Sequence, residues 1–315
     1  MQTDRTEFQV TDPFRATQAA RADLRALASI VICSVIWGTT WYAITLQLGT
    51  VDPTASVTYR FALASVVLFL FCWWWREPIR LSGPQHMAVF GQGVLTFSIQ
   101  YSMVYEAEQH IASAVVAVIF AGLAFVNLVL FRVLLGQRAN WRAWVGAMLG
   151  VVGVAAMFIA ELRRSGGGHE VLFGLTIALV AMIFAAAGNL AAWKAQKAGA
   201  PVLGSVAWAM AYGAGLVFLF GLATGVEFTF EMTPAYVGSL LYLSIFGSVV
   251  AFALYFILAR AKGYALASYI SALTPPVALL MSVIFENARF GWVAALGVAL
   301  VLAGQVLLIR APKGG

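Results

Sequence analysis

The sequence predicts an all-α polytopic membrane protein whose ten transmembrane helices form two inverted five-helix repeats. Of its 315 residues, 62% are hydrophobic and only 10% are charged, whereas an ordinary soluble domain carries about 25% charged residues. Long apolar runs follow one another with short breaks along almost the whole chain. A pattern of tryptophan and glycine in the fifth run also recurs in the tenth.

The apolar runs define the ten predicted helices, because a transmembrane helix requires about 20 mostly apolar residues. The breaks between the runs are short and contain turn-forming or charged residues, as in VDPT at 51–54. The approximate limits of the runs are 26–48, 55–75, 87–105, 111–131, 143–160, 171–192, 203–222, 235–259, 265–285 and 291–309.

Lysine and arginine give the orientation of these helices. With the N-terminus in the cytoplasm, fifteen of the nineteen Lys and Arg residues fall on the cytoplasmic side, as the positive-inside rule requires. We therefore expect a multi-pass protein of the bacterial inner membrane with both termini cytoplasmic. Residues 1–25 form a charged, polar leader, either an interfacial helix or a solvated tail, and residues 310–315 form a short tail.

The repeat is visible in the spacing W-x4-G-x6-G, which begins at Trp141 and again at Trp292. It divides the chain into a first repeat, 26–160, and a second, 171–309, joined by a loop at 161–170. Each half has five runs, so the second copy must be inverted in the membrane. Inverted repeats are typical of secondary transporters, which bind their substrate near the midplane between the halves.

Further motifs resemble the EamA module of the drug/metabolite transporter superfamily. They are Trp37-Gly38 in the first run, Pro53 followed by RFALA at 60–64 in the second, and, best marked, LYLSIFGSVVAFALYFILARAKGYALASYISALTPPVALLMSVIFENARF at 241–290. The resemblance covers 26–309 and implies two inverted repeats around a central cavity. Within the superfamily, the chain is most similar to the YddG-type amino-acid exporters, which implies export of amino acids.

Catalysis is not expected from this sequence. All three histidines and all thirteen acidic residues lie at or beyond the ends of the runs, so no catalytic pair or metal cluster assembles within the membrane. We expect no enzyme activity, cofactor or metal site. The positive charge is explained by cytoplasmic loops and requires no nucleic-acid partner.

Arg60 is the one charged side chain that the pattern places inside a run. In a structural role its side chain reaches toward the outer headgroups or pairs with backbone carbonyls. In a functional role it contacts a substrate carboxylate or acts in gating. Proton-coupled carriers commonly use acids or histidines within their spans. Their absence here favours a facilitator or exchanger over a proton antiporter.

Selectivity must then come from neutral polar and aromatic residues that share helical faces. Each of them has a structural interpretation as well, in interhelical packing or hydrogen bonding. Pro275 either frees carbonyls for a ligand and acts as a hinge, or it only kinks the helix for packing. The predicted substrate-binding residues are Trp41, Gln100, Tyr101, Asn189, Ser244, Ser248, Ser271 and Pro275.

Together these observations predict a transporter of a small organic solute, with amino acids or similar metabolites as the first choice. Alternatives are a carrier of a vitamin, nucleoside, nucleotide sugar or organic cation, and a channel or receptor without turnover. The absence of acids and bases at mid-membrane argues against organic cations and phosphorylated sugars. Membrane lipids are the expected surroundings, and a monomer or weak dimer the expected assembly.

Overall fold

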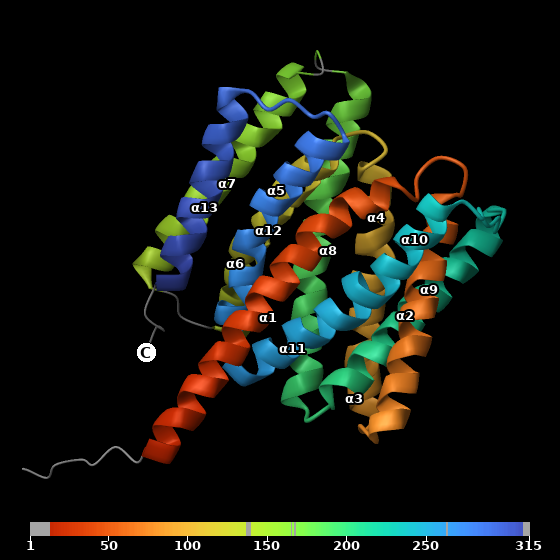
Figure 1. The fold of residues 1–315 in the computed structure, drawn as a ribbon, viewed down its shortest axis with the longest axis vertical. Helices are drawn as coiled ribbons and strands as arrows, with labels where there is room; N and C mark the ends of the chain where they lie inside the picture. The colour runs from red at the N-terminus through yellow and green to blue at the C-terminus, as the bar shows by residue number, and fades with distance from the viewer. Residues whose placement is uncertain (1–12, 137–139, 165, 167, 263, 311–315) are drawn as a thin grey trace, which may run out of the picture.

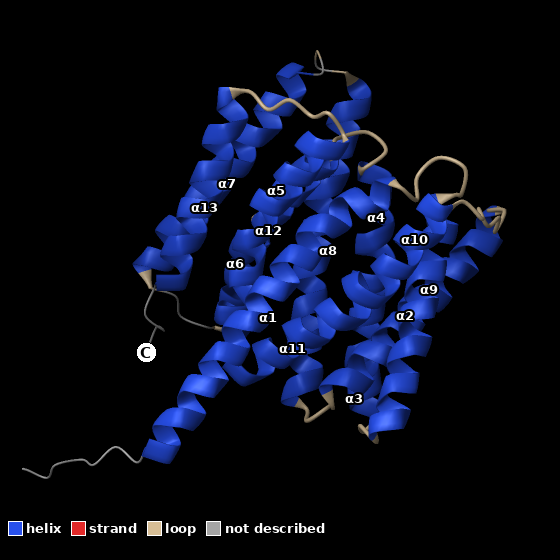
Figure 2. Ribbon diagram, in the orientation of Figure 1, coloured by secondary structure: helices blue, strands red, loops and turns tan. Residues whose placement is uncertain are grey.

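The predicted fold class is confirmed. The computed structural model describes residues 13–136, 140–164, 166, 168–262 and 264–310, and every regular element in these residues is helical (Figures 1 and 2). By length and composition, seven segments of this part can cross a membrane, and two shorter apolar helices follow at 273–285 and 292–304.

The first half contains five membrane segments, of which the third and fourth are interrupted. Its elements are α1 (Pro13–Thr45), α2 (Pro53–Trp75), α3 (Gly83–Gln92), the π-helix η1 (Gly93–Gln100), α4 (Tyr101–Ala107), α5 (Ser113–Ala121), α6 (Leu123–Leu135) and α7 (Trp141–Arg164). The backbone of 13–25, predicted as part of the leader, is one continuous helix with the first span, and it projects away from the bundle in Figure 1.

The second half repeats this order. Its elements are α8 (His169–Lys197), α9 (Val202–Thr224), α10 (Pro234–Tyr242), the π-helix η2 (Leu243–Val250), α11 (Ala251–Lys262), α12 (Tyr264–Phe285) and α13 (Trp292–Arg310). The backbone of α1 begins and that of α13 ends on the same side of the bundle (Figure 1).

Local sequence explains where several helices begin. Asp52 precedes α2 and its carboxylate accepts a hydrogen bond from the Thr54 amide at 2.7 Å, with Pro53 as the first helical residue. Thr233 caps α10 in the same way, with Pro234 next in the chain. A polar side chain followed by proline is a favourable helix start, because it satisfies a free amide and proline needs none.

The contacts between helices follow the repeat. Helix α2 packs against α9, and α7 against α13, so that two pairs of equivalent helices face each other. These pairs form opposite flanks of the molecule in Figure 1, and the remaining segments lie between them. An inverted repeat produces this arrangement, because its two-fold axis passes between equivalent helices.

The repeated glycines are the point where α7 and α13 approach most closely. A methyl group built on Gly153 would lie 2.5 Å from the carbonyl oxygen of Gly297, and one built on Gly304 would overlap the carbonyl oxygen of Gly146. Only glycine permits such backbone contact between membrane helices. The W-x4-G-x6-G pattern therefore joins the two halves within one chain.

Four membrane segments depart from regular α-helix, and they do so in pairs. The third and eighth segments contain η1 and η2, each eight residues long. The fourth is interrupted at Gly122, between α5 and α6, and the ninth contains Pro275 and Pro276 within α12. Irregular backbone at membrane depth is tolerated where it is buried in protein or lines a cavity.

Candidate functional site

A cavity lies between the two halves, at the level of these irregular segments. Its cavity volume is about 100 Å³, several times the space that one buried water molecule needs. Aromatic rings and neutral polar groups form most of its wall, and the described lining includes no charged side chain. The lining residues are Trp37, Thr40, Trp41, Ile44, Thr96, Gln100, Tyr101, Ala117, Phe120, Ala121, Leu123, Ala185, Asn189, Phe252, Tyr255 and Thr274.

Four of the predicted binding residues lie on this wall: Trp41, Gln100, Tyr101 and Asn189. Gln100 and Asn189 come from different halves and are 5% and 8% exposed. In the described part of the chain, neither amide has a hydrogen-bond partner, although a buried amide normally finds several. The two side chains therefore offer donors and acceptors to an occupant of the cavity.

The two tryptophans of the first span have different surroundings. The Trp37 indole nitrogen donates to the Gly247 carbonyl at 3.1 Å, and its ring packs 5.2 Å from Phe252. The Trp41 ring packs 5.2 Å from Phe120, but its buried N–H finds no acceptor among the described residues. Trp37 therefore fixes α1 against η2, whereas Trp41 presents a free donor at the cavity wall.

Ser244 and Ser248 do not line the cavity. Ser248 accepts a hydrogen bond from Arg60 Nε at 3.1 Å and donates to the Leu243 carbonyl, while the Ser244 hydroxyl is buried with no partner in the described region. The prediction assumed α-helical spacing, whereas η2 is a π-helix with i→i+5 bonds and more residues per turn. Its serine face turns toward α2, which packs against η2.

Pro275 does not itself line the cavity, but the preceding residue, Thr274, does. Pro275 is buried but is not part of the described wall, whereas Thr274 lines it and donates to the Ile270 carbonyl at 2.8 Å. The side chain of Ser271, also predicted to bind substrate, lies outside the described residues.

Arg60 is fully buried rather than extended toward the headgroups. Besides Ser248, its Nη1 donates to the Tyr105 hydroxyl at 3.4 Å, and its guanidinium lies 4.7 Å from the centre of the Tyr101 ring. Among the described residues it forms no ion pair, and its Nη2 has no acceptor. The cation is thus one residue behind the cavity wall, separated from it by Tyr101.

Sequence reasoning missed several wall residues. Thr40 and Ile44 complete the helical face of Trp37 and Trp41 in an i, i+3, i+4, i+7 pattern, so this face was readable from the sequence. Phe252 gave no such signal, because an aromatic residue in an apolar run is usually packing. Among the described residues, no three His, Cys, Asp or Glu side chains lie together in a way that could hold a metal ion.

A comparison with known protein families shows to which of them the chain is related. The EamA-like transporter family matches it twice, over residues 24–159 and 172–310. The chain belongs to the EamA-like transporter family. The resemblance seen in the motifs is thereby confirmed, and the two matches correspond to the two copies of the fold. The similarity to YddG-type exporters stays a prediction.

One of the relatives of this EamA-like chain is named as a transporter. It is 27% identical to an uncharacterized inner membrane transporter, YedA, of Escherichia coli (strain K12), over 88% of this chain and 90% of YedA. It is 24% identical to PecM of Dickeya dadantii, over 87% and 88% of the two chains. The match to PagO of Salmonella typhimurium, 23% identical, spans only 46% of that protein and 44% of this chain.

A solved crystal structure shares the fold. It aligns with a TM-score of 0.67 at 18% identity, over 90% of this chain and 95% of the other. The EamA-like chain is therefore a multi-pass helical membrane protein of a transporter family whose members handle small molecules.

Proposed function

We propose that this EamA-like protein exports small organic solutes, amino acids foremost, across the bacterial inner membrane. Its halves, 26–160 and 171–309, alternate access to the cavity, and the carrier works as a facilitator or exchanger without enzyme activity. Both termini are cytoplasmic, in agreement with the distribution of Lys and Arg. YedA, which is named as an inner membrane transporter, supports this location.

The observation that carries the proposal is the chemistry of the cavity wall. Its polar groups are neutral: the side-chain amides of Gln100 and Asn189 lie on the wall, and the N–H of the lining residue Trp41 is buried and unpaired among the described residues. These donors suit a carboxylate, and the faces of Trp37 and Tyr255 suit an ammonium group. A zwitterion satisfies both without a buried counter-ion, whereas a net charge would remain uncompensated.

The same aromatic wall also favours a second substrate class. Trp37, Trp41, Phe120 and Phe252 offer ring faces to a planar neutral solute, and the amides can pair with its edges. A nucleoside is therefore the second candidate.

The test is counterflow in proteoliposomes without any ion gradient. Vesicles loaded with unlabelled amino acids should accumulate labelled amino acids saturably, which a channel or receptor cannot do. No accumulation by folded protein would discard the amino-acid proposal, and nucleosides would be tried next.

Replacement of Gln100 by Leu tests the site itself. Loss of a hydrogen bond to a charged group costs about 1.5–3 kcal/mol, so we expect the half-saturating concentration to rise roughly 10- to 150-fold. Gln92→Leu is the matched control, because Gln92 is also a buried glutamine of the third span but does not line the cavity. Equal losses of folded protein and transport in both variants would make Gln100 a structural residue.

A further inference from the structure

A buried polar network lies behind the cavity and leaves three of its members incompletely bonded. Arg60 donates to Tyr105, whose hydroxyl donates to Gln47 Oε1 at 2.7 Å. Yet Arg60 Nη2, Gln47 Nε2 and both carboxylate oxygens of Glu108 have no partner among the described residues. The three side chains are 0%, 1% and 7% exposed. Buried polar atoms without partners are rare.

These unpaired atoms are complementary. Two donors lack acceptors, and a carboxyl group with two acceptor atoms lacks donors. Glu108 follows Tyr105 by three residues, at the end of α4, so it lies on the same helical face. Arg60 and Glu108 interact electrostatically without forming an ion pair. A buried cation and a buried acid that do not pair each leave a charge without a counter-ion, which is costly in the protein interior.

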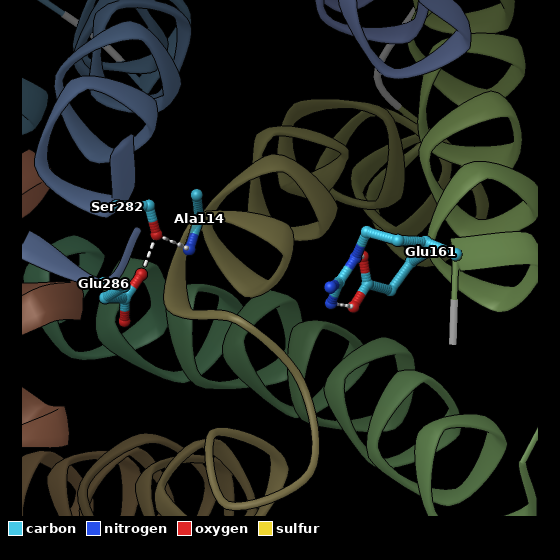
Figure 3. Close-up of polar contacts among 5 residues, drawn as sticks. Ala114, Glu161, Ser282 and Glu286 are labelled. Atoms are coloured by element: carbon cyan, nitrogen blue, oxygen red, sulfur yellow. Dashed lines mark hydrogen bonds and ion pairs between the residues drawn. The ribbon is translucent and has the colours of Figure 1, made fainter. Parts of the chain in front are cut away.

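The charges around Glu108 disfavour its ionised form in the arrangement described here. Burial and the nearby Glu286 carboxylate raise the pKa of Glu108 well above its ordinary value, and Arg60 opposes this more weakly. Glu286 follows α12 and accepts hydrogen bonds from Ser113 and from Ser282, the second of which is drawn in Figure 3.

Three titratable groups near Glu108 in the chain or in space contact one another. His110, two residues after Glu108, contacts Glu106 at 3.1 Å and Glu170 of α8 at 2.7 Å. Tyr105 is the titratable group on α4 itself, and it is engaged with Gln47 and Arg60. None of these groups provides Glu108 with a counter-ion in the described structure.

We propose that Glu108 is a proton-binding site through which the carrier couples solute export to proton entry. The inference rests on the proposed transport function and names the ion that the solute is exchanged for. In the arrangement described here the Glu108 carboxyl group holds the proton. In the opposite arrangement Arg60 Nη2 and Gln47 Nε2 turn to the carboxylate, and the proton leaves. One proton enters for each solute exported, and no further reactant is needed.

This site changes the expectation about energy coupling. The sequence placed every acid at or beyond the ends of the spans, which favoured transport without a proton gradient. The structure places Glu108 at the end of α4 but buries it within electrostatic reach of Arg60, a charged residue inside a span. Exchange of one solute molecule for another then needs no proton gradient, whereas net export of solute is driven by the proton gradient.

Infrared spectroscopy of the purified full-length protein tests the site without any solute. The carbonyl band of protonated carboxylic acids should titrate with pH in the wild type and be weaker in Glu108→Gln, where Glu286 still contributes to it. Glu170→Gln is the matched control, because it removes the same charge from a side chain that is 80% exposed. A band that is unchanged in Glu108→Gln would overturn the proposal.

Transport in proteoliposomes tests the coupling. Vesicles that are acidic inside should accumulate labelled amino acids up to about tenfold per pH unit, the ratio for one proton per zwitterion. In Glu108→Gln we expect this gradient-driven accumulation to be lost while counterflow remains, and in Glu170→Gln both should remain. Gradient-driven accumulation by Glu108→Gln would overturn the coupling. If wild-type counterflow fails, the amino-acid proposal fails, and the infrared band still decides whether Glu108 binds a proton.

Discussion

Replacement of Gly153 by alanine should destabilise the protein through one contact between its halves. The added methyl group would lie 2.5 Å from the Gly297 oxygen and 2.7 Å from Val301 Cγ2, whereas optimal carbon contacts are about 3.5–4.0 Å. Both neighbours belong to the backbone or a β-branched side chain of α13, so the two helices must separate by about 1 Å. Overpacking of this kind costs about 1–3 kcal/mol.

Gly150 is the matched control on the same helix. A methyl group there has no atom within 4 Å, so Gly150→Ala should gain about 1 kcal/mol from helix propensity alone. The same propensity gain applies at Gly153. The difference between the two variants therefore isolates the packing cost, and we expect Gly153→Ala to be less stable than Gly150→Ala by about 1–3 kcal/mol.

The free energy of unfolding would be measured by detergent titration in mixed micelles, with circular dichroism as the readout. Gly304→Ala provides an independent arm, because its methyl group would press on the Gly146 oxygen at the repeat-related contact. Equal free energies of unfolding for the Gly153 and Gly150 variants would refute the close approach of α7 and α13.

Three further outcomes are expected. Trp37→Phe removes the hydrogen bond to Gly247 and should lower the free energy of unfolding by about 0.6 kcal/mol, measured in the same titration; no change would mean that the bond is not formed. Trp41→Phe keeps an aromatic side chain but removes the free N–H, so it should weaken solute half-saturation about tenfold in counterflow; an unchanged value would mean that the N–H does not contact the solute. Burial raises the pKa of Glu286, so the stability linked to its protonated form is present in acid and lost as pH rises through that raised pKa. The melting temperature of the wild type should therefore fall relative to Glu286→Gln between acid and neutral pH, and parallel curves would contradict this.

The fold was largely predictable because it is determined by the apolar composition of long segments of the chain. A membrane requires long apolar helices, and their number, order and repeat are written in the hydropathy and in the glycine spacing. The π-helices were not predictable in this way. The segment 243–250 is as apolar as its neighbours, and its i→i+5 bonding depends on contacts such as Gly247 against Thr40, which come from a distant part of the chain.

The candidate site was predictable only where it follows helical spacing. Gln100 and Asn189 stood out because primary amides are uncommon in apolar runs. The burial of Glu108 could not be read from the sequence, because it depends on how the end of α4 packs against distant parts of the chain, as Tyr105 of α4 does by bonding to Gln47. Tertiary burial of a residue at a helix end has no local signal.

The two π-helices also bear on the history of the chain. A π-helical turn accommodates one more residue than the α-helix around it, and it arises most simply when a residue is inserted into an existing helix. Because η1 and η2 are of equal length and occur at equivalent places in both halves, a single insertion before gene duplication accounts for both.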